Sequence, residues 1–251
     1  MLKKFLLHCI AAVMLLILLP LCSDAGQWTK VDAVTLRFEG PIETNDIDQF
    51  NDLIDDGITT IIVMSGGGDT LAALPIAEII QRRQLNIIVD GICGSSCANY
   101  FFIAAHEKTV PPGSLVMWHG GLTPKLRHGS REMKAYMRRA GMPPQQIKRQ
   151  FQSWREGAAR ERMLYQKAGV DMALLDYSSV VTQRAYDFWA PPPDTLRELG
   201  VGNIISFWYP ASANELNKLA NRLRSNYYRR FRKTAAPPLN ILGGDLCRPD
   251  P

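Results

Sequence analysis

Two adjacent serines hold the clearest potential for chemistry in this sequence. The segment GICGSSCANYFFIAA, residues 91–105, runs from a glycine-bearing turn into an apolar helix, and Ser95 and Ser96 lie where that helix begins. The first backbone N–H groups of a helix have no partner within it, and they stabilise negative charge that develops beside them. Either hydroxyl can serve as a nucleophile if a base lies next to it, although a serine that merely caps the helix has the same sequence context.

The candidate base is found among four histidines, one of which lies in the N-terminal apolar run. His106 lies at the far end of the helix that Ser95 would begin, and His128 lies in a predicted polar loop. His119 follows LVMW and precedes a glycine pair, which places it at the carboxyl end of a predicted strand. His119 is therefore the candidate partner for the serine, and an ordinary histidine at a strand end is the alternative interpretation.

The elements predicted around these residues bring them to one edge of a sheet. Alternating or continuous apolar runs predict strands at 33–38, 60–64, 86–89 and 115–118, and helical spacing predicts helices at 45–54, 71–81 and 97–105. This alternation predicts an α/β fold with a mainly parallel sheet, in which ligands bind beyond the carboxyl ends of the strands. The glycine cluster at 66–68, the turn at 91–97 and His119 all fall there.

The second half of the chain is predicted to be mostly helical. Residues 130–183 have helical character with an interruption at 141–144, a short helix and a strand follow at 195–199 and 203–205, and 211–233 forms a last helix before an irregular tail. That last helix has a basic end without an intervening acid: Arg222, Arg224, Arg229, Arg230, Arg232 and Lys233. A solvated helix face is one interpretation, and contact with a membrane surface or an acidic partner is the other.

The N-terminus predicts that the protein leaves the cytoplasm. Two lysines precede a mostly apolar stretch over residues 5–21, and small residues follow up to Ala25, a pattern typical of a secretory signal over residues 1–25. The alternative is a retained inner-membrane anchor formed by residues 5–21. Export to the periplasm or another extracytoplasmic space argues against a nucleic-acid partner, and the net charge of +5 is too mild to indicate one.

Three of the five cysteines lie beyond this segment. Because thiols outside the cytoplasm tend to oxidise, Cys93 and Cys97 are a candidate disulfide pair and Cys247 is the odd one. A metal site is disfavoured, since no histidine–cysteine ligand set accompanies them.

The sequence resembles the Clp/crotonase-fold family, in particular the proteolytic subunit of the Clp proteases and its exported relatives such as signal peptide peptidase A. IIVMSGGGDTLAALPIAEII (61–80) resembles the family's strand, glycine loop and helix, GICGSSCANYFFIAA its nucleophile segment, and SLVMWHGG (114–121) its histidine strand. YDFWAPPPDTLRELGVGNII (186–205) resembles, more loosely, the segment with the family's acid. The pattern C-x-S-x-C departs from the cytoplasmic enzymes and is similar to an exported group.

This resemblance implies a ββα superhelix over residues 26–210, with a helical insertion at about 123–184 and a basic helical tail at 211–251. It implies a serine peptidase in which Ser95 is the nucleophile, His119 the base and Asp187 the acid that orients His119. Backbone N–H groups of Gly68 and Ser96 would form the oxyanion hole, with Gly67 as an alternative donor. No cofactor is implied, and the expected partners are a peptide or protein substrate and further copies of the chain.

Two other functions remain open from the sequence. A non-catalytic member of the family would use the same crevice to bind a peptide or an envelope protein, and the loose match around Asp187 favours that alternative. Acyl-CoA chemistry, known from the crotonase branch, ranks third because the serine–histidine pair suits peptidases better.

Overall fold

The structure, a computed structural model, describes residues 25–184, 187–231 and 238–243. It confirms the predicted α/β class and the mainly parallel sheet. Residues 1–24, which hold the predicted signal or anchor, lie outside the described residues, as do Arg232, Lys233 and Cys247. Among the helices of the described ranges, none has the length and apolarity needed to cross a membrane.

The central sheet has the order β1-β2-β3-β4-β5-β8, with β6 pairing on the distal half of β4. All of these pairings are parallel except that of β1 with β2. The strands are β1 (Gln27–Lys30), β2 (Thr35–Glu39), β3 (Thr60–Ser65), β4 (Asn86–Gly94), β5 (Lys108–Val110), β6 (Leu115–Met117) and β8 (Ile204–Phe207). β1 and β5 are short strands that the apolar pattern did not predict.

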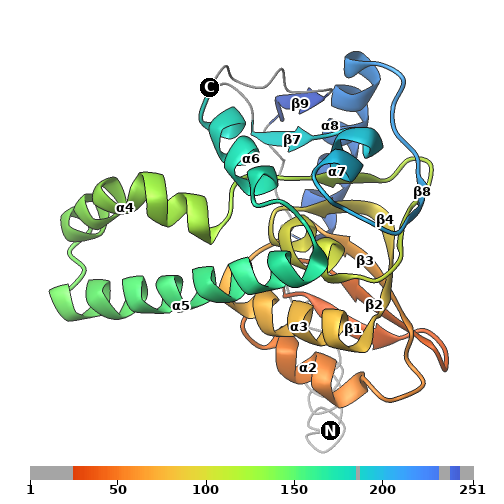
Figure 1. Cartoon of the computed structure of the whole chain (residues 1–251), viewed down its shortest axis with the longest axis horizontal. Coiled ribbons are helices and arrows are strands. Elements are labelled where there is room, and N and C mark those ends of the chain that lie inside the picture. The colour runs from red at the N-terminus through yellow and green to blue at the C-terminus, as the bar shows by residue number, and fades with distance from the viewer. Residues whose placement is uncertain (1–24, 185–186, 232–237, 244–251) are drawn as a thin grey trace, which may run out of the picture.

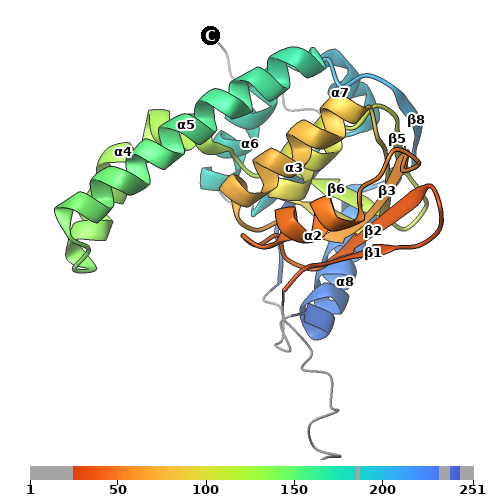
Figure 2. The ribbon, with the colours of Figure 1, turned by 90° about the horizontal axis from the view of Figure 1, so that it is seen from below.

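Helices cover both faces of this sheet. Figure 2 shows α2 (Asp46–Leu53) and α3 (Thr70–Arg83) on one face and α8 (Ala213–Phe231) on the other. Side chains alternate between the two faces of a strand, so β4 and β6 each contribute to both cores. Cys93 and Val116 pack into the larger core with α3, whereas Ile92 and Met117 pack into a smaller core beneath α8. The apolar side chains on this face of the sheet are therefore buried, because α8 covers them.

The segment between His119 and Asp187 forms a helical arm. It consists of α4 (Leu122–Arg139), α5 (Pro144–Ala168) and α6 (Ala173–Arg184), and Figure 1 shows α4 and α5 projecting together from the body of the molecule. The predicted interruption at 141–144 is the turn between α4 and α5, while α4 begins eight residues earlier than the helical pattern predicted. His128 therefore lies within α4 and not in a loop.

The C-terminal part of the chain returns to the site. β7 (Phe188–Ala190) pairs in parallel with β9 (Ile241–Gly243), and α7 (Pro193–Glu198) follows β7. The expectation of an irregular tail was wrong for residues 241–243, because the sequence of three residues is too short to show a strand period. Leu239 and Ile241 are buried in the core beneath α8, which ties this strand to the body.

Candidate active site

Ser95 lies at the sharp turn between β4 and the π-helical segment η1 (Cys97–Phe102). Its backbone is left-handed, with φ of +53°, a conformation that residues other than glycine rarely adopt. The turn is held at both sides: the Ser95 N–H donates to the Met117 carbonyl at 3.0 Å, and the Ser95 carbonyl accepts from Asn99 N–H at 2.8 Å. The surrounding bonds thus stabilise a strained serine at the end of a buried strand, a pattern typical of functional sites.

His119 lies against this serine. Its Nε2 is 2.6 Å from Ser95 Oγ, a hydrogen bond between residues 24 positions apart in the chain. The position of His119 is fixed by the preceding residue, because Trp118 and Trp189 exchange two backbone hydrogen bonds of 2.8 Å. The structure therefore brings together the serine and the histidine that the sequence analysis placed at neighbouring strand ends.

Ser96, the other candidate nucleophile, faces a different neighbour. It is buried, and its hydroxyl donates to the Gly68 carbonyl at 2.9 Å and lies 3.4 Å from Thr70 Oγ1. Its hydroxyl makes no hydrogen bond to His119 among the described residues. The geometry therefore favours Ser95 as the nucleophile. The hydroxyl of Ser96 instead holds the glycine loop against the turn.

The glycine loop after β3 passes very close to the serine turn. A Cβ atom on Gly67, whose φ is +88°, would lie 2.6 Å from Gly94 O and 2.8 Å from Ser96 N, and a Cβ on Gly68 would collide with the backbone of Ile42. Only glycine fits at either position. The Gly67 N–H donates to Ser65 Oγ at 3.1 Å, whereas those of Gly68 and Ser96 have no acceptor among the described residues. Gly68 and Ser96 are thus the better pair of donors for an oxyanion.

Asp187 lies near His119 without a hydrogen bond to it. Its carboxylate accepts from Asn240 N–H at 3.0 Å, and its own N–H donates to the Asn240 carbonyl at 2.8 Å. The side chain is exposed to solvent. Its charge nevertheless reaches the imidazole and acts to raise the pKa of His119. The structure therefore joins two members of the predicted triad and leaves the third at longer range.

The protonation state of His119 follows from three influences. Burial of much of the ring lowers its pKa below the usual 6.5, the positive charge of Lys125 lowers it further, and Asp187 opposes both. His119 nevertheless keeps substantial solvent-exposed surface. A lowered pKa keeps the imidazole neutral at pH 7, which is the form that can accept a proton from a serine hydroxyl.

A buried carboxylate supports the histidine loop, and the sequence analysis missed it. Glu161, on α5, is fully buried and accepts hydrogen bonds from Leu122 N–H at 2.9 Å, Thr123 N–H at 2.7 Å and the Tyr100 hydroxyl at 2.7 Å. It thereby caps the N-terminus of α4, directly after the His119 loop. Nothing in the sequence distinguishes Glu161 from Glu156, the other acid of this helix, because the partners of Glu161 lie about 40 and 60 residues away.

The carbonyl and the amide of Gly120 are held as well. Asn99 Nδ2 donates to the Gly120 carbonyl at 2.5 Å, and the Gly120 N–H donates to Ser178 Oγ at 2.9 Å. Asn99 Oδ1 is buried and has no partner among the described residues. Asn99 and Ser178 come from η1 and α6, so the loop after His119 is fixed from two directions.

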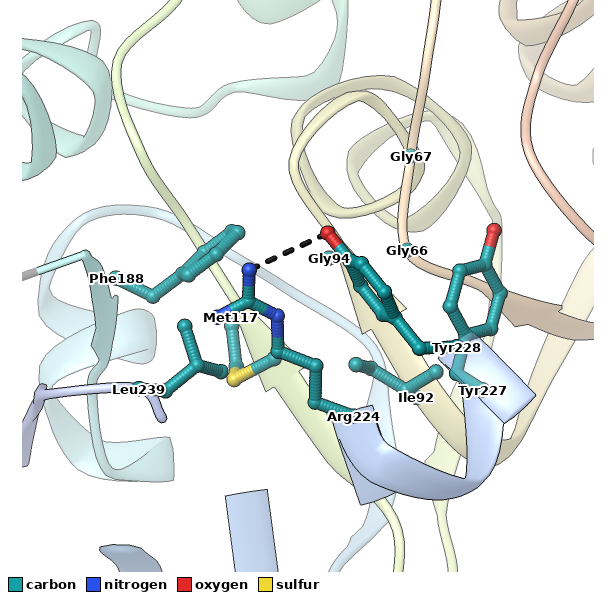
Figure 3. Close-up of a pocket in the computed structure, with 10 residues that line it drawn as sticks. All are labelled: Gly66, Gly67, Ile92, Gly94, Met117, Phe188, Arg224, Tyr227, Tyr228 and Leu239. Carbon is teal, nitrogen blue, oxygen red and sulfur yellow. Dashed lines mark hydrogen bonds between the residues drawn. The ribbon is translucent and has the colours of Figure 1, made fainter. Parts of the chain in front are cut away.

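Two cavities flank the serine–histidine pair. The larger, about 350 Å³, is lined by both side chains together with Thr70, Asn99, Lys125 and the start of α4. The smaller, about 100 Å³, lies on the side of α8 and is lined by glycines of the site and by apolar and aromatic side chains, as Figure 3 shows. The pair is thus accessible to a ligand that extends in two directions.

Cys93 and Cys97 bracket the serine turn. Their sulfur atoms are joined in the structure at 2.02 Å, and both residues are fully buried. The bond would link the end of β4 to the first residue of η1. Within the described residues, no group of three or more histidine, cysteine, aspartate or glutamate side chains could hold a metal ion.

Comparison with known proteins finds likeness at the level of structure. No family model and no curated protein matches the chain. Among solved structures, it is similar to a mutant of the 1510-N membrane-bound stomatin-specific protease, with 20% identity, a TM-score of 0.39 and coverage of 75% of this chain and 83% of that one. It is also similar to AtuE of Pseudomonas aeruginosa, with 11% identity, a TM-score of 0.36 and coverage of 84% and 78%.

A third similar structure is an enoyl-CoA hydratase/isomerase of Xanthobacter autotrophicus Py2, with 11% identity and a TM-score of 0.31 over 84% of this chain and 98% of that one. The neighbours therefore include a protease and a protein named for acyl-CoA chemistry.

Proposed function

We propose that this chain is an exported Clp/crotonase-fold serine hydrolase that cleaves peptide bonds through Ser95. The observation that carries the proposal is the 2.6 Å contact between Ser95 Oγ and His119 Nε2, two side chains that line a cavity. The backbone N–H groups of Gly68 and Ser96 have no acceptor in the described part of the chain. Ser96 directly follows the same serine, and the Gly68 carbonyl accepts from the Ser96 hydroxyl. A nucleophile, a base and oxyanion donors in one place suit acyl transfer to serine.

The proposed reaction begins with a proton transfer. His119 Nε2 takes the proton of Ser95 Oγ as the oxygen bonds to the substrate carbonyl carbon, and the carbonyl oxygen becomes an oxyanion near the N–H groups of Gly68 and Ser96. The imidazolium then gives its proton to the departing amine, which leaves an ester on Ser95. Water, deprotonated by His119, hydrolyses that ester and restores both side chains. The negative charge of Asp187 favours the imidazolium at each stage.

The two cysteines fit this proposal and the export that it includes. A Cys93–Cys97 disulfide would fix both ends of the serine turn, and such bonds persist outside the cytoplasm. Mass spectrometry of the exported protein should find the two residues joined, and finding both as free thiols would contradict this part of the proposal.

Hydrolysis of an unbiased peptide mixture tests the activity. Wild-type protein should generate new N-termini, and Ser95→Ala should lower the rate by at least about 10⁴-fold, as for other serine nucleophiles. His119→Gln should lower it to a similar extent because the two groups act as a unit. Equal rates for wild type and Ser95→Ala would overturn the proposal.

A non-catalytic peptide-binding protein is the second candidate. The observation that favours it is the separation of Asp187 from His119, since an imidazole without a hydrogen-bonded acid is a weaker base. This alternative predicts peptide binding that is saturable, unchanged in Ser95→Ala and not followed by cleavage.

A further inference from the structure

The smaller cavity directly adjoins the residues proposed to react. Gly94, which precedes Ser95, and Gly67, which touches the serine turn, both line it. Phe188 lines it as well, and its ring makes an edge-to-face contact with His119, with 4.7 Å between ring centres. A group bound in this cavity would therefore lie beside the bond that Ser95 attacks.

The walls of the cavity are mostly apolar. Ile92 and Met117 come from the sheet, Leu239 from the segment before β9, and two tyrosines from α8. Its volume of about 100 Å³ compares with about 30 Å³ for one molecule of liquid water, so it holds a group of a few heavy atoms. A single amino-acid side chain or a chain terminus is of that size.

A charged group, Arg224, is among the described residues that line this cavity. Arg224 reaches from α8 and lies between the rings of Phe188 and Tyr228, as Figure 3 shows. Its guanidinium stacks on Tyr228, 4.9 Å from the ring centre, and Nη2 donates to the Tyr228 hydroxyl at 3.3 Å. A guanidinium carries five N–H donors in one plane and matches a carboxylate in both charge and geometry.

We infer that this cavity is a specificity pocket in which Arg224 binds a carboxylate of the substrate next to the scissile bond. The inference rests on the proposed function and adds the substrate class to it. The carboxylate belongs either to an acidic side chain or to a free C-terminus, since both present the same group. Helix α8 is then part of the active site. Arg224 binds the substrate under this inference, whereas the sequence analysis considered a membrane surface as a partner for the basic residues of this helix.

Covalent probes of serine hydrolases test this inference before any substrate has been identified. Three peptidyl phosphonates carry a glutamate-like, a glutamine-like or a leucine-like side chain next to the phosphorus atom, and the rate of modification of Ser95 is measured for each. A second experiment measures how well short peptides ending in a free carboxylate, or in an amide, protect Ser95 from a fluorophosphonate.

The matched variants are Arg224→Gln and Arg222→Gln. Arg222 lies on the same helix, is exposed and does not line the cavity, so its loss controls for the charge of α8. Wild type should prefer the acidic over the amide probe at least about 10-fold, or should be protected at least about 10-fold better by the free carboxylate, as expected of a charge-assisted hydrogen bond. Arg224→Gln should abolish the preference, Arg222→Gln should keep it, and Arg224→Lys should retain part of it.

The outcomes separate the inference from the function on which it rests. If Ser95 reacts but wild type shows no preference in either experiment, or if Arg224→Gln and Arg224→Lys leave the preference intact, the carboxylate pocket is wrong and the hydrolase stands. If the fluorophosphonate modifies no serine of the wild type, the proposed function fails and the pocket with it. A preference in the probe series alone identifies an acidic side chain, and one in the protection series alone identifies a C-terminus.

Discussion

The residue at the centre of the site holds an unfavourable backbone conformation. A left-handed φ at a residue other than glycine costs on the order of 1–3 kcal/mol, and at Ser95 this cost is offset by bonds to Met117 and Asn99. In return, Oγ leaves the plane of the sheet and meets His119 Nε2. The same turn leaves the next N–H, that of Ser96, without an acceptor among the described residues. One strained residue therefore presents a nucleophile and an oxyanion donor together.

Lys125 should set the acid limb of the pH–rate profile. Because its charge lowers the pKa of His119, Lys125→Met should raise that pKa, so that activity is lost at a higher pH as the imidazole protonates. The measurement is kcat/KM against pH from about 4.5 to 8. Lys134→Met is the control, since Lys134 lies farther along α4 and stacks on Phe151. A profile unchanged in Lys125→Met, or shifted equally in both variants, would contradict this role of Lys125.

At the scale of elements, the arm is joined to the site by one carboxylate. Glu161 lies on α5, yet its three acceptor contacts are to η1 and to the first turn of α4. Burial of the phenol groups raises the pKa of Tyr100 and of Tyr165 well above 10, and the negative charge of Glu161 raises both further. Glu161 acts through the loop that carries His119, which makes it a positioning residue.

Two buried tyrosines whose pKa values Glu161 raises give a matched test of this contact. Tyr100→Phe removes a hydrogen bond to a buried carboxylate and should lower the free energy of unfolding by about 1.5–3 kcal/mol. Tyr165→Phe should change it little or increase it, because the Tyr165 hydroxyl is buried without a partner among the described residues. Urea unfolding of both variants measures the difference. Equal destabilisation would show that Glu161 does not depend on Tyr100.

At the scale of the whole molecule, the C-terminal part of the described chain packs back against the body and reaches the site. Arg230, near the end of α8, pairs with Glu39 of β2 at 2.6 Å, and β9 pairs with β7 beside His119. The Arg230 pair is half-exposed and contributes little to stability by itself. The apolar contacts of Leu239 and Ile241 in the core beneath α8 hold this region in place.

Shortening the chain tests whether β9 supports the site. A protein ending at residue 238 loses β9 and the Asn240 N–H that binds Asp187, so its kcat should fall by at least about 10-fold, the effect of about 1.4 kcal/mol. A protein ending at residue 243 keeps both and should retain wild-type activity. The measurement is turnover of the same peptide by the two proteins at matched folded fraction. Equal turnover would mean that β9 is dispensable.

The local sequence pattern was sufficient to predict the positions of residues that lie at strand ends. The buried strands ending at Met64 and Trp118 and the turn at 91–97 place a serine, a histidine and glycines at one sheet edge, and the structure brings Ser95 and His119 into contact. Chain order and periodicity determine such an edge in a parallel sheet.

Contacts between segments that are distant in the chain could not be predicted from the local sequence pattern. Glu161 and Arg224 each look like one of several charged residues on an amphipathic helix, and only packing shows that one is buried and the other lines a cavity. Asp187 was assigned from a loose resemblance. Its hydrogen bond with Asn240 depends on the pairing of β7 with β9, and a strand of three residues is too short to be predicted from its sequence.

The modified residue, identified after reaction with a fluorophosphonate, tests the central claim most directly. Wild type and Ser96→Ala should both be modified on the peptide that contains position 95, with Ser96→Ala slower by about 5-fold for the loss of one hydrogen bond to Gly68. Ser95→Ala should not react. Modification that persists in Ser95→Ala and disappears in Ser96→Ala, or a wild type that does not react at all, would contradict the account.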